Sequence, residues 1–114
     1  MGIAGGSVTD WRSYDSIYTE RYMGLPAKNP EGYRDTAPRH AAAALSGRLL
    51  LVHGAFDDNV HPGNTLQLAY ELQKAGKPFQ MMMYPKSAHG VSDPQLTPHL
   101  RGMMLDFTTK NLLR

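Results

Sequence analysis

The chain has 114 residues, a net charge of +2, 41% hydrophobic residues and no cysteine, which fits one small globular domain without disulfides or cysteine-based metal sites. Its Lys and Arg residues are scattered rather than clustered, so we expect no nucleic-acid partner. No apolar run approaches the roughly 20 residues of a membrane-spanning helix, so we expect no membrane contact from this chain.

The first half of the chain predicts a short strand followed by helices. Residues 2–7 are small and resemble the end of a strand, and a helix is expected over residues 11–23. Prolines and glycines predict a loop over residues 24–34. A second helix is expected over residues 36–46, with Thr36 as its N-cap.

The second half alternates strands with helices. A strand is predicted over residues 48–53 because four consecutive apolar residues run into a His-Gly pair. A helix over residues 64–75, a strand over 79–84 and a loop over 85–98 are expected to follow. The last helix is expected to begin at Thr97, at the end of that loop. This alternation predicts an α/β fold with a mostly parallel sheet and right-handed crossovers.

An acid and a histidine follow two successive predicted strands. Asp57 and Asp58 come after the first strand and His89 comes after the second. Functional side chains of open α/β sheets lie at the carboxyl ends of the strands, and the order Ser, Asp, His is that of the α/β-hydrolases. Asp57 and His89 are therefore candidates for the acid and base of a hydrolase triad. The alternative is that Asp57 or Asp58 caps a turn and His89 is an ordinary loop histidine.

A metal site is a second hypothesis for these residues. The residue types that would suit zinc or manganese are His53, Asp57, Asp58, His61 and His89. They show no compact ligand spacing, so we expect no metal and no cofactor.

The nucleophile is not evident in the sequence. The nucleophile elbow of this fold has the pattern Gly-x-Ser-x-Gly. None of the six serines has glycine both two positions before it and two positions after it. Ser7 comes nearest, with Gly5 two positions before it but Thr9 two positions after it. The sequence therefore predicts an acid and a base without an identified serine.

An aromatic stripe precedes these residues. Trp11, Tyr14 and Tyr18 have the i, i+3, i+7 spacing that places side chains on one face of a helix. Such a stripe is either part of the hydrophobic core or the wall of a pocket.

Several of these segments together resemble the C-terminal part of the peptidase domain in the prolyl oligopeptidase family, and best its dipeptidyl peptidase IV branch. The similar segments are 8–11 (VTDW), 14–24 (YDSIYTERYMG), 53–61 (HGAFDDNVH), 64–67 (NTLQ) and 89–90 (HG). The resemblance implies the last strands and helices of an α/β-hydrolase domain that is joined to a β-propeller.

The resemblance also implies roles for individual residues. Asp57 would be the triad acid, His89 the triad base and Asp58 a structural neighbour. A proline-accepting pocket would contain Val8, Trp11, Tyr14, Tyr18, Asn59 and Val60. The implied substrate is a peptide with proline near its N-terminus, and whether a dipeptide or a tripeptide is released stays open.

The elbow and the propeller of the family lie upstream of the matching part, so residues 1–114 are expected to be a C-terminal portion that is inactive alone. Two other hypotheses stay open, a non-catalytic binding or assembly module and a general esterase on the same fold. An open sheet edge at residues 2–7 predicts a homo-oligomer that pairs there. No signal-peptide pattern is present, and a periplasmic or secreted parent protein is implied by the resemblance alone.

Overall fold

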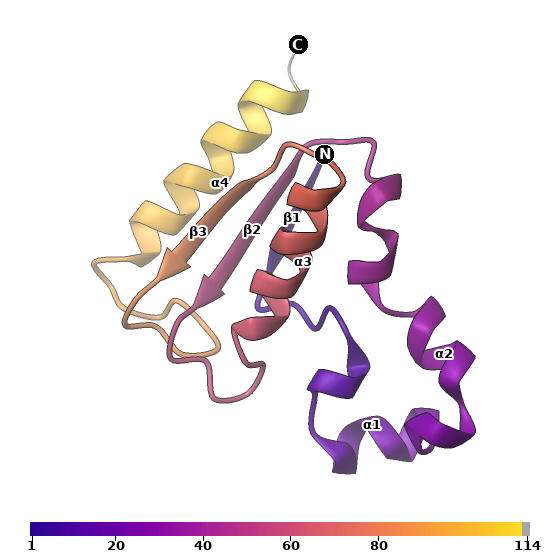
Figure 1. Ribbon diagram of the computed structural model, residues 1–114. Coiled ribbons are helices and arrows are strands. Elements are labelled where there is room, and N and C mark those ends of the chain that lie inside the picture. The colour runs from indigo at the N-terminus through magenta and orange to yellow at the C-terminus, as the bar shows by residue number, and fades with distance from the viewer. Residues whose placement is uncertain (113–114) are drawn as a thin grey trace.

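The computed structural model describes residues 1–112 of the chain, which form an α/β fold around a three-stranded parallel sheet (Figure 1). Helices of the 3₁₀ type are labelled η. In chain order the elements are β1 (Gly2–Gly5), η1 (Trp11–Ser13), α1 (Ser16–Met23), η2 (Pro26–Lys28), α2 (Pro30–Asp35), η3 (Pro38–Ala44), β2 (Leu49–Gly54), α3 (Gly63–Lys74), β3 (Gln80–Tyr84) and α4 (Thr97–Leu112).

Strand β2 is the centre of the sheet. The strand order is β1-β2-β3, and both neighbours pair with β2 in parallel, with Ala4 opposite Leu51 and Val52 opposite Met82. Five of the six β2 residues are buried, as a run of apolar residues without alternation predicts for a strand covered on both faces. The expected parallel α/β sheet is confirmed.

Helices cover both faces of the sheet, α3 with η3 on one side and α4 on the other (Figure 1). Residues of β2 alternate between the two resulting cores. Leu51 packs with Leu68 and Leu72 of α3, whereas Leu50 packs with Phe107 of α4. This double cover fixes the sheet, so its carboxyl ends hold the following loops at defined positions.

The prediction of a single helix over residues 11–23 is wrong, because two aspartate N-caps divide this segment into two helices. The Asp10 carboxylate accepts from Arg12 N and starts η1, and the Asp15 carboxylate accepts from Tyr18 N and starts α1. Tyr14 between them is extended, with φ −114° and ψ 169°. Each aspartate satisfies free N–H groups of its own first turn, so the segment folds as two short helices.

The predictions for residues 24–46 also need correction. The expected loop over 24–34 contains η2 and α2, whose first residues are Pro26 and Pro30. Proline fits the first turn of a helix because its missing N–H has no partner there anyway. The expected α-helix over 36–46 is instead the 3₁₀ helix η3, and Thr36 ends α2 rather than capping η3.

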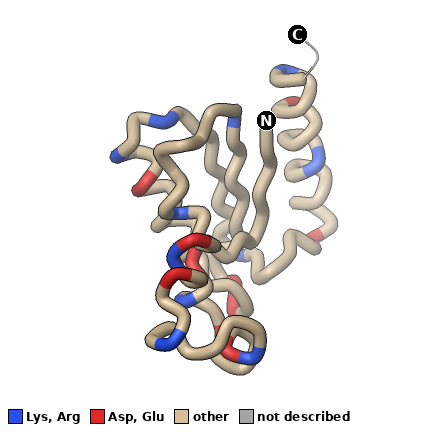
Figure 2. The backbone as a smooth tube through the Cα atoms, turned by 90° about the vertical axis from the view of Figure 1, so that its right-hand side faces the viewer, with Lys and Arg blue, Asp and Glu red and all other residues tan. Residues whose placement is uncertain are grey.

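Positive and negative residues are interspersed along the chain in Figure 2, and the three strands carry no Lys, Arg, Asp or Glu. All Lys, Arg, Asp and Glu side chains within residues 1–112 therefore lie in the loops and helices outside the sheet. Within residues 1–112, no helix is both long and apolar enough to cross a membrane.

Candidate active site

Asp57 and His89 lie in contact at the carboxyl end of the sheet. Asp57 follows β2 and His89 follows β3, and the two are 32 positions apart in the sequence. The His89 Nδ1 atom lies 2.9 Å from Asp57 Oδ2. The carboxylate is fully buried, whereas the His89 side chain is 48% exposed. This is the geometry of a buried acid that orients an accessible imidazole.

The loops that carry the two residues are bonded to each other. Phe56 N donates a 3.0 Å hydrogen bond to the Ser87 carbonyl oxygen. Gly54, the last residue of β2, lets this approach happen, because a Cβ there would overlap the carbonyl oxygens of Ser87 and Ala88. The backbone before His89 therefore rests directly on the end of β2.

Backbone N–H groups hold the other carboxylate oxygen of Asp57. Oδ1 accepts from Asn59 N at 3.0 Å and from Val60 N at 2.8 Å. Burial by itself raises the pKa of Asp57, but the hydrogen bond from His89 and those two N–H groups outweigh it. The net pKa of Asp57 lies below its ordinary value, so the side chain is a stable carboxylate.

The imidazole of His89 faces Gly6, just past the end of β1. A Cβ built on Gly6 would lie 3.2 Å from His89 Cε1, and Gly6 has a φ of 55°. Because Asp57 engages Nδ1, the second ring nitrogen, Nε2, is the one available to a reacting group. Within residues 1–112, no serine hydroxyl hydrogen-bonds to His89, and Ser7 is half-buried beyond Gly6.

The aromatic residues gather beside this pair although they do not share one helix. Tyr14 packs edge-on against Trp11 and Tyr18, with ring centroids 6.0 and 5.5 Å apart, and Tyr18 stacks on Trp11 at 6.0 Å. The Tyr14 hydroxyl donates a 2.6 Å hydrogen bond to Asn59 Oδ1. The aromatic cluster is thus joined to the loop that holds Asp57.

Two other residues of the predicted pocket are Val60 and Val8. Val60 is 4% exposed and belongs to the Asp57 loop through its N–H. Val8 is half-buried and precedes Thr9, which bonds to Asn64 of α3 through its N–H (3.1 Å) and its hydroxyl (2.6 Å). The segment before the aromatic cluster is therefore fixed to the helix that follows the acid loop.

The partners of two buried polar residues, Asp10 and His53, were not predicted from the sequence. Asp10 is 1% exposed and forms ion pairs with Arg12 at 3.1 Å and Arg39 at 2.8 Å. His53 is 1% exposed and contacts the acid loop from beneath. For His53, an imidazole at the end of the apolar run of β2 is a signal for such a role, but its partners depend on the fold.

Three of the five residues of the metal hypothesis lie together, since His53 and His89 both contact Asp57 Oδ2. Asp58 and His61 are exposed, and His61 Nδ1 accepts from Gly63 N at 3.0 Å. In the part of the chain that the structure describes, no group of three or more His, Asp or Glu side chains could hold a metal ion.

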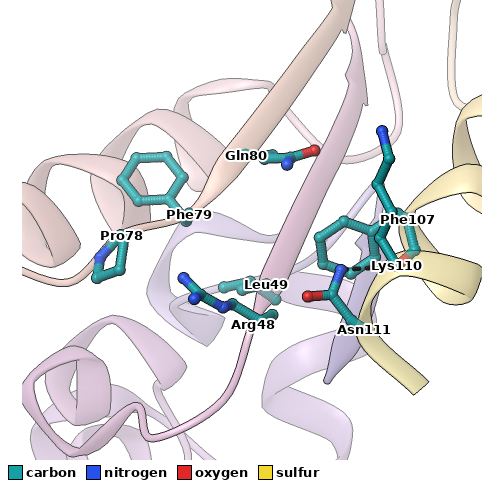
Figure 3. Close-up of a pocket in the computed structure, with 8 residues that line it drawn as sticks. All are labelled: Arg48, Leu49, Pro78, Phe79, Gln80, Phe107, Lys110 and Asn111. Carbon is teal, nitrogen blue, oxygen red and sulfur yellow. Dashed lines mark hydrogen bonds between the residues drawn. The ribbon is translucent and has the colours of Figure 1, made fainter. Parts of the chain in front are cut away.

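A hollow of about 340 Å³ lies at the opposite, amino end of β2 and β3 (Figure 3). Its lining residues are Arg48, Leu49, Pro78, Phe79, Gln80, Phe107, Lys110 and Asn111. None of these side chains is a carboxylate or an imidazole, so this hollow offers no acid–base pair. The candidate active site is the carboxyl end of the sheet.

Comparison with known proteins places this geometry among peptidases. Residues 1–114 match the profile described as the prolyl oligopeptidase family. The chain is 50% identical to probable dipeptidyl-aminopeptidase B of Aspergillus niger over 93 residues, which cover 80% of this chain and 10% of that protein. It is 39% identical to dipeptidyl peptidase 8 of Mus musculus, over 98% of this chain and 13% of that protein.

A solved structure gives the same result for the fold. Dipeptidyl peptidase 4 of Porphyromonas gingivalis superposes with a TM-score of 0.95 and 40% sequence identity, covering 97% of this chain and 16% of that one. The chain spans about a tenth of the length of the curated relatives that it matches.

Proposed function

Because this chain belongs to the prolyl oligopeptidase family, we propose that it supplies the acid, the base and much of the substrate pocket of a serine peptidase. The observation that carries the proposal is the 2.9 Å contact between His89 Nδ1 and the buried carboxylate of Asp57. In this role Asp57 fixes the tautomer of His89 and stabilises the imidazolium that forms during the reaction.

The chemistry follows from the free ring nitrogen. With Nδ1–H donated to Asp57, the lone pair of Nε2 accepts the proton of an attacking serine hydroxyl and later gives it to the leaving amine. In the proposed function this serine comes from outside the 114 residues, since the chain has no Gly-x-Ser-x-Gly segment. Alone, the chain would then form no acyl-enzyme.

The aromatic cluster supports a preference for proline. Trp11, Tyr14 and Tyr18 form a cluster of flat rings, and the Tyr14 hydroxyl joins it to Asn59 of the loop that holds Asp57. A flat apolar wall suits a pyrrolidine ring. We therefore propose that the parent protein cleaves peptides with proline near the N-terminus.

A chimera tests the acid and base roles. In it, this chain replaces the matching segment of the Porphyromonas gingivalis dipeptidyl peptidase 4. We expect hydrolysis of a Gly-Pro anilide, and we expect His89→Ala or Asp57→Asn to lower kcat by roughly 10³- to 10⁴-fold. Asp58→Asn, a change of an exposed neighbour, serves as the control and should leave kcat near that of the parent chimera. Equal loss in all three variants would contradict the roles given to Asp57 and His89.

Two further measurements separate the other hypotheses. A fluorophosphonate probe should give no adduct on the purified 114-residue chain by intact mass, and a stoichiometric adduct would show that it carries its own activated serine. In the chimera, Tyr18→Ala should lower turnover of the proline substrate far more than hydrolysis of a simple ester. Equal losses on both substrates would favour a general esterase.

A further inference from the structure

His53, the fifth residue of β2, is an imidazole enclosed beneath the candidate active site. It is 1% exposed, and each ring nitrogen has a polar partner. Nδ1 lies 2.7 Å from the Thr65 hydroxyl oxygen, and Nε2 lies 2.8 Å from the Val60 carbonyl oxygen. Both partners are themselves buried, so water does not compete for these bonds.

These partners determine the tautomer of His53. A carbonyl oxygen only accepts hydrogen bonds, so Nε2 must carry a proton to donate to Val60. The hydroxyl of Thr65 hydrogen-bonds to no other described group, so its proton is directed at Nδ1. The ring is then the neutral Nε2–H form, which the Val60 carbonyl requires and which the Thr65 hydroxyl supports by donating to Nδ1.

This tautomer acts on Asp57 in two ways. The bond to the Val60 carbonyl anchors the turn whose Val60 N–H donates to Asp57 Oδ1 at 2.8 Å. In addition, Nε2 lies 3.1 Å from Asp57 Oδ2, the same oxygen that His89 contacts from the other side. The positive end of the Nε2–H dipole therefore stands beside the carboxylate, and the turn cannot shift without breaking the His53 bond.

We propose that His53 is a positioning residue for the Asp57–His89 pair, held between the Val60 carbonyl and the Thr65 hydroxyl in the tautomer that keeps the Asp57 carboxylate facing His89. The value of this role to catalysis rests on the proposed function. The geometric part does not, because it concerns only residues within this chain.

The test is the tautomer of each histidine in the 114-residue chain, measured from the long-range ¹H–¹⁵N correlations of the imidazole rings at neutral pH. We expect His53 as Nε2–H and His89 as Nδ1–H. Thr65→Val removes the hydroxyl with little change of shape and leaves the buried Nδ1 lone pair without a partner. The His53 ring is then held less firmly, so His89 should shift toward its Nε2–H form. Thr65→Ser keeps the hydroxyl and should restore the original ratio.

A matched control is available in Thr19, which is 3% exposed and whose hydroxyl has no hydrogen-bond partner. Thr19→Val makes the same chemical change away from the site and should leave His89 unaltered. If Thr65→Val fails to fold, His53→Gln serves in its place, since its amide N–H replaces the Nε2 donor and should keep His89 as Nδ1–H. Loss of that form in His53→Gln would overturn the proposal.

Other outcomes are equally decisive. A wild-type His53 found as Nδ1–H or doubly protonated at neutral pH overturns the inference, as does a folded Thr65→Val chain with His89 unchanged. In both cases the proposed function stands if His89 is still Nδ1–H. A wild-type His89 that shows no Nδ1–H preference instead contradicts the acid–base pair and so the proposed function.

Discussion

Gly6 stands against the candidate base, where its lack of a side chain has two effects. Its φ of 55° is in the left-handed region, and a Cβ there would lie 3.2 Å from His89 Cε1. Gly76 also has a left-handed φ, 65°, but a Cβ there would meet nothing within 4 Å. Comparing variants at the two glycines therefore distinguishes the effect of backbone strain from the effect of contact with His89.

We expect Gly6→Ala and Gly76→Ala each to lower the free energy of unfolding by about 1–2 kcal/mol, the cost of left-handed backbone for a residue with a Cβ. Only Gly6→Ala should displace the His89 ring signals in a ¹H–¹⁵N spectrum, because only it crowds the imidazole. Urea unfolding and the ring spectrum of both variants give the comparison. Unchanged His89 signals in Gly6→Ala would mean that the ring is free to move away.

At this scale the sequence predicted which residues meet but not what holds them. Asp57 and His89 follow successive strands, and parallel strands place their carboxyl ends side by side, so their contact was accessible from the pattern. The pattern did not predict the hydrogen bond from His53 to the Asp57 loop or the closeness of Gly54 to the Ser87 carbonyl. They depend on which loop lies over which strand end, and no local spacing encodes that contact.

Asp10 links two elements of the excursion between β1 and β2. It caps η1 and pairs with Arg39 of η3, and its side chain is only 2% exposed. Burial by itself raises the pKa of Asp10, but the hydrogen bonds from Arg12 and the charges of Arg39 and Arg12 outweigh it. The net pKa of Asp10 in the folded chain lies below its ordinary value of 3.8.

Acid should therefore weaken the fold through Asp10. With the folded pKa below the unfolded one, its contribution is complete above the ordinary carboxyl pKa and is lost as the pH falls through the folded value. Asp10→Asn should lower the free energy of unfolding at neutral pH by about 2 kcal/mol and flatten its dependence on acidic pH. Asp35→Asn, in an exposed pair with Arg34, should change both very little. Urea unfolding from pH 7 to pH 2 gives these values, and equal slopes in the two variants would contradict this account.

The aromatic cluster depends on η1 and α1 keeping their relative position. Trp11 is the single tryptophan, and the Tyr18 ring stacks on it at 6.0 Å with 26° between the planes. Tyr18→Ala should uncover this indole, giving a red-shifted emission and stronger acrylamide quenching. Tyr70→Ala, at an exposed tyrosine of α3 that packs near Lys74, is the matched control without effect. Identical spectra in the two variants would show that Trp11 is not covered by Tyr18.

Among the elements, those with a clear apolar pattern were predicted correctly, whereas those whose limits depend on capping residues were not. Strands β2 and β3 and helices α3 and α4 have runs or periods of apolar residues that bury against the sheet. The segment from residue 11 to residue 46 has few buried residues, so local hydrogen bonds decide its conformation. There Asp15 begins a second helix inside the one that periodicity favoured.

The sheet of the described chain has two edge strands, β1 and β3, and each pairs with β2 alone. At β1, Gly2 N and Gly6 N point toward β2, so the N–H groups of Ile3 and Gly5 face the outer edge. We propose that a second copy of the chain pairs there, which would satisfy these groups.

Light scattering after gel filtration should then give at least twice the 12.6 kDa of one chain. Gly5→Pro removes one edge donor without removing a bond to β2 and should yield monomer. Leu105→Glu changes an exposed residue of α4 and should leave the mass of the assembly unaltered. A shift to monomer in Leu105→Glu alone would place the interface on α4 instead.

The arrangement of the acid and the base along the chain has a consequence for inheritance. Asp57 and His89 are separated by one helix and one strand, α3 and β3, whereas the aromatic cluster is encoded before residue 24. A gene breakpoint between α1 and β2 would exchange the aromatic cluster and transmit Asp57 and His89 together. Under the proposed function, recombination there would change the substrate preference and keep the reaction.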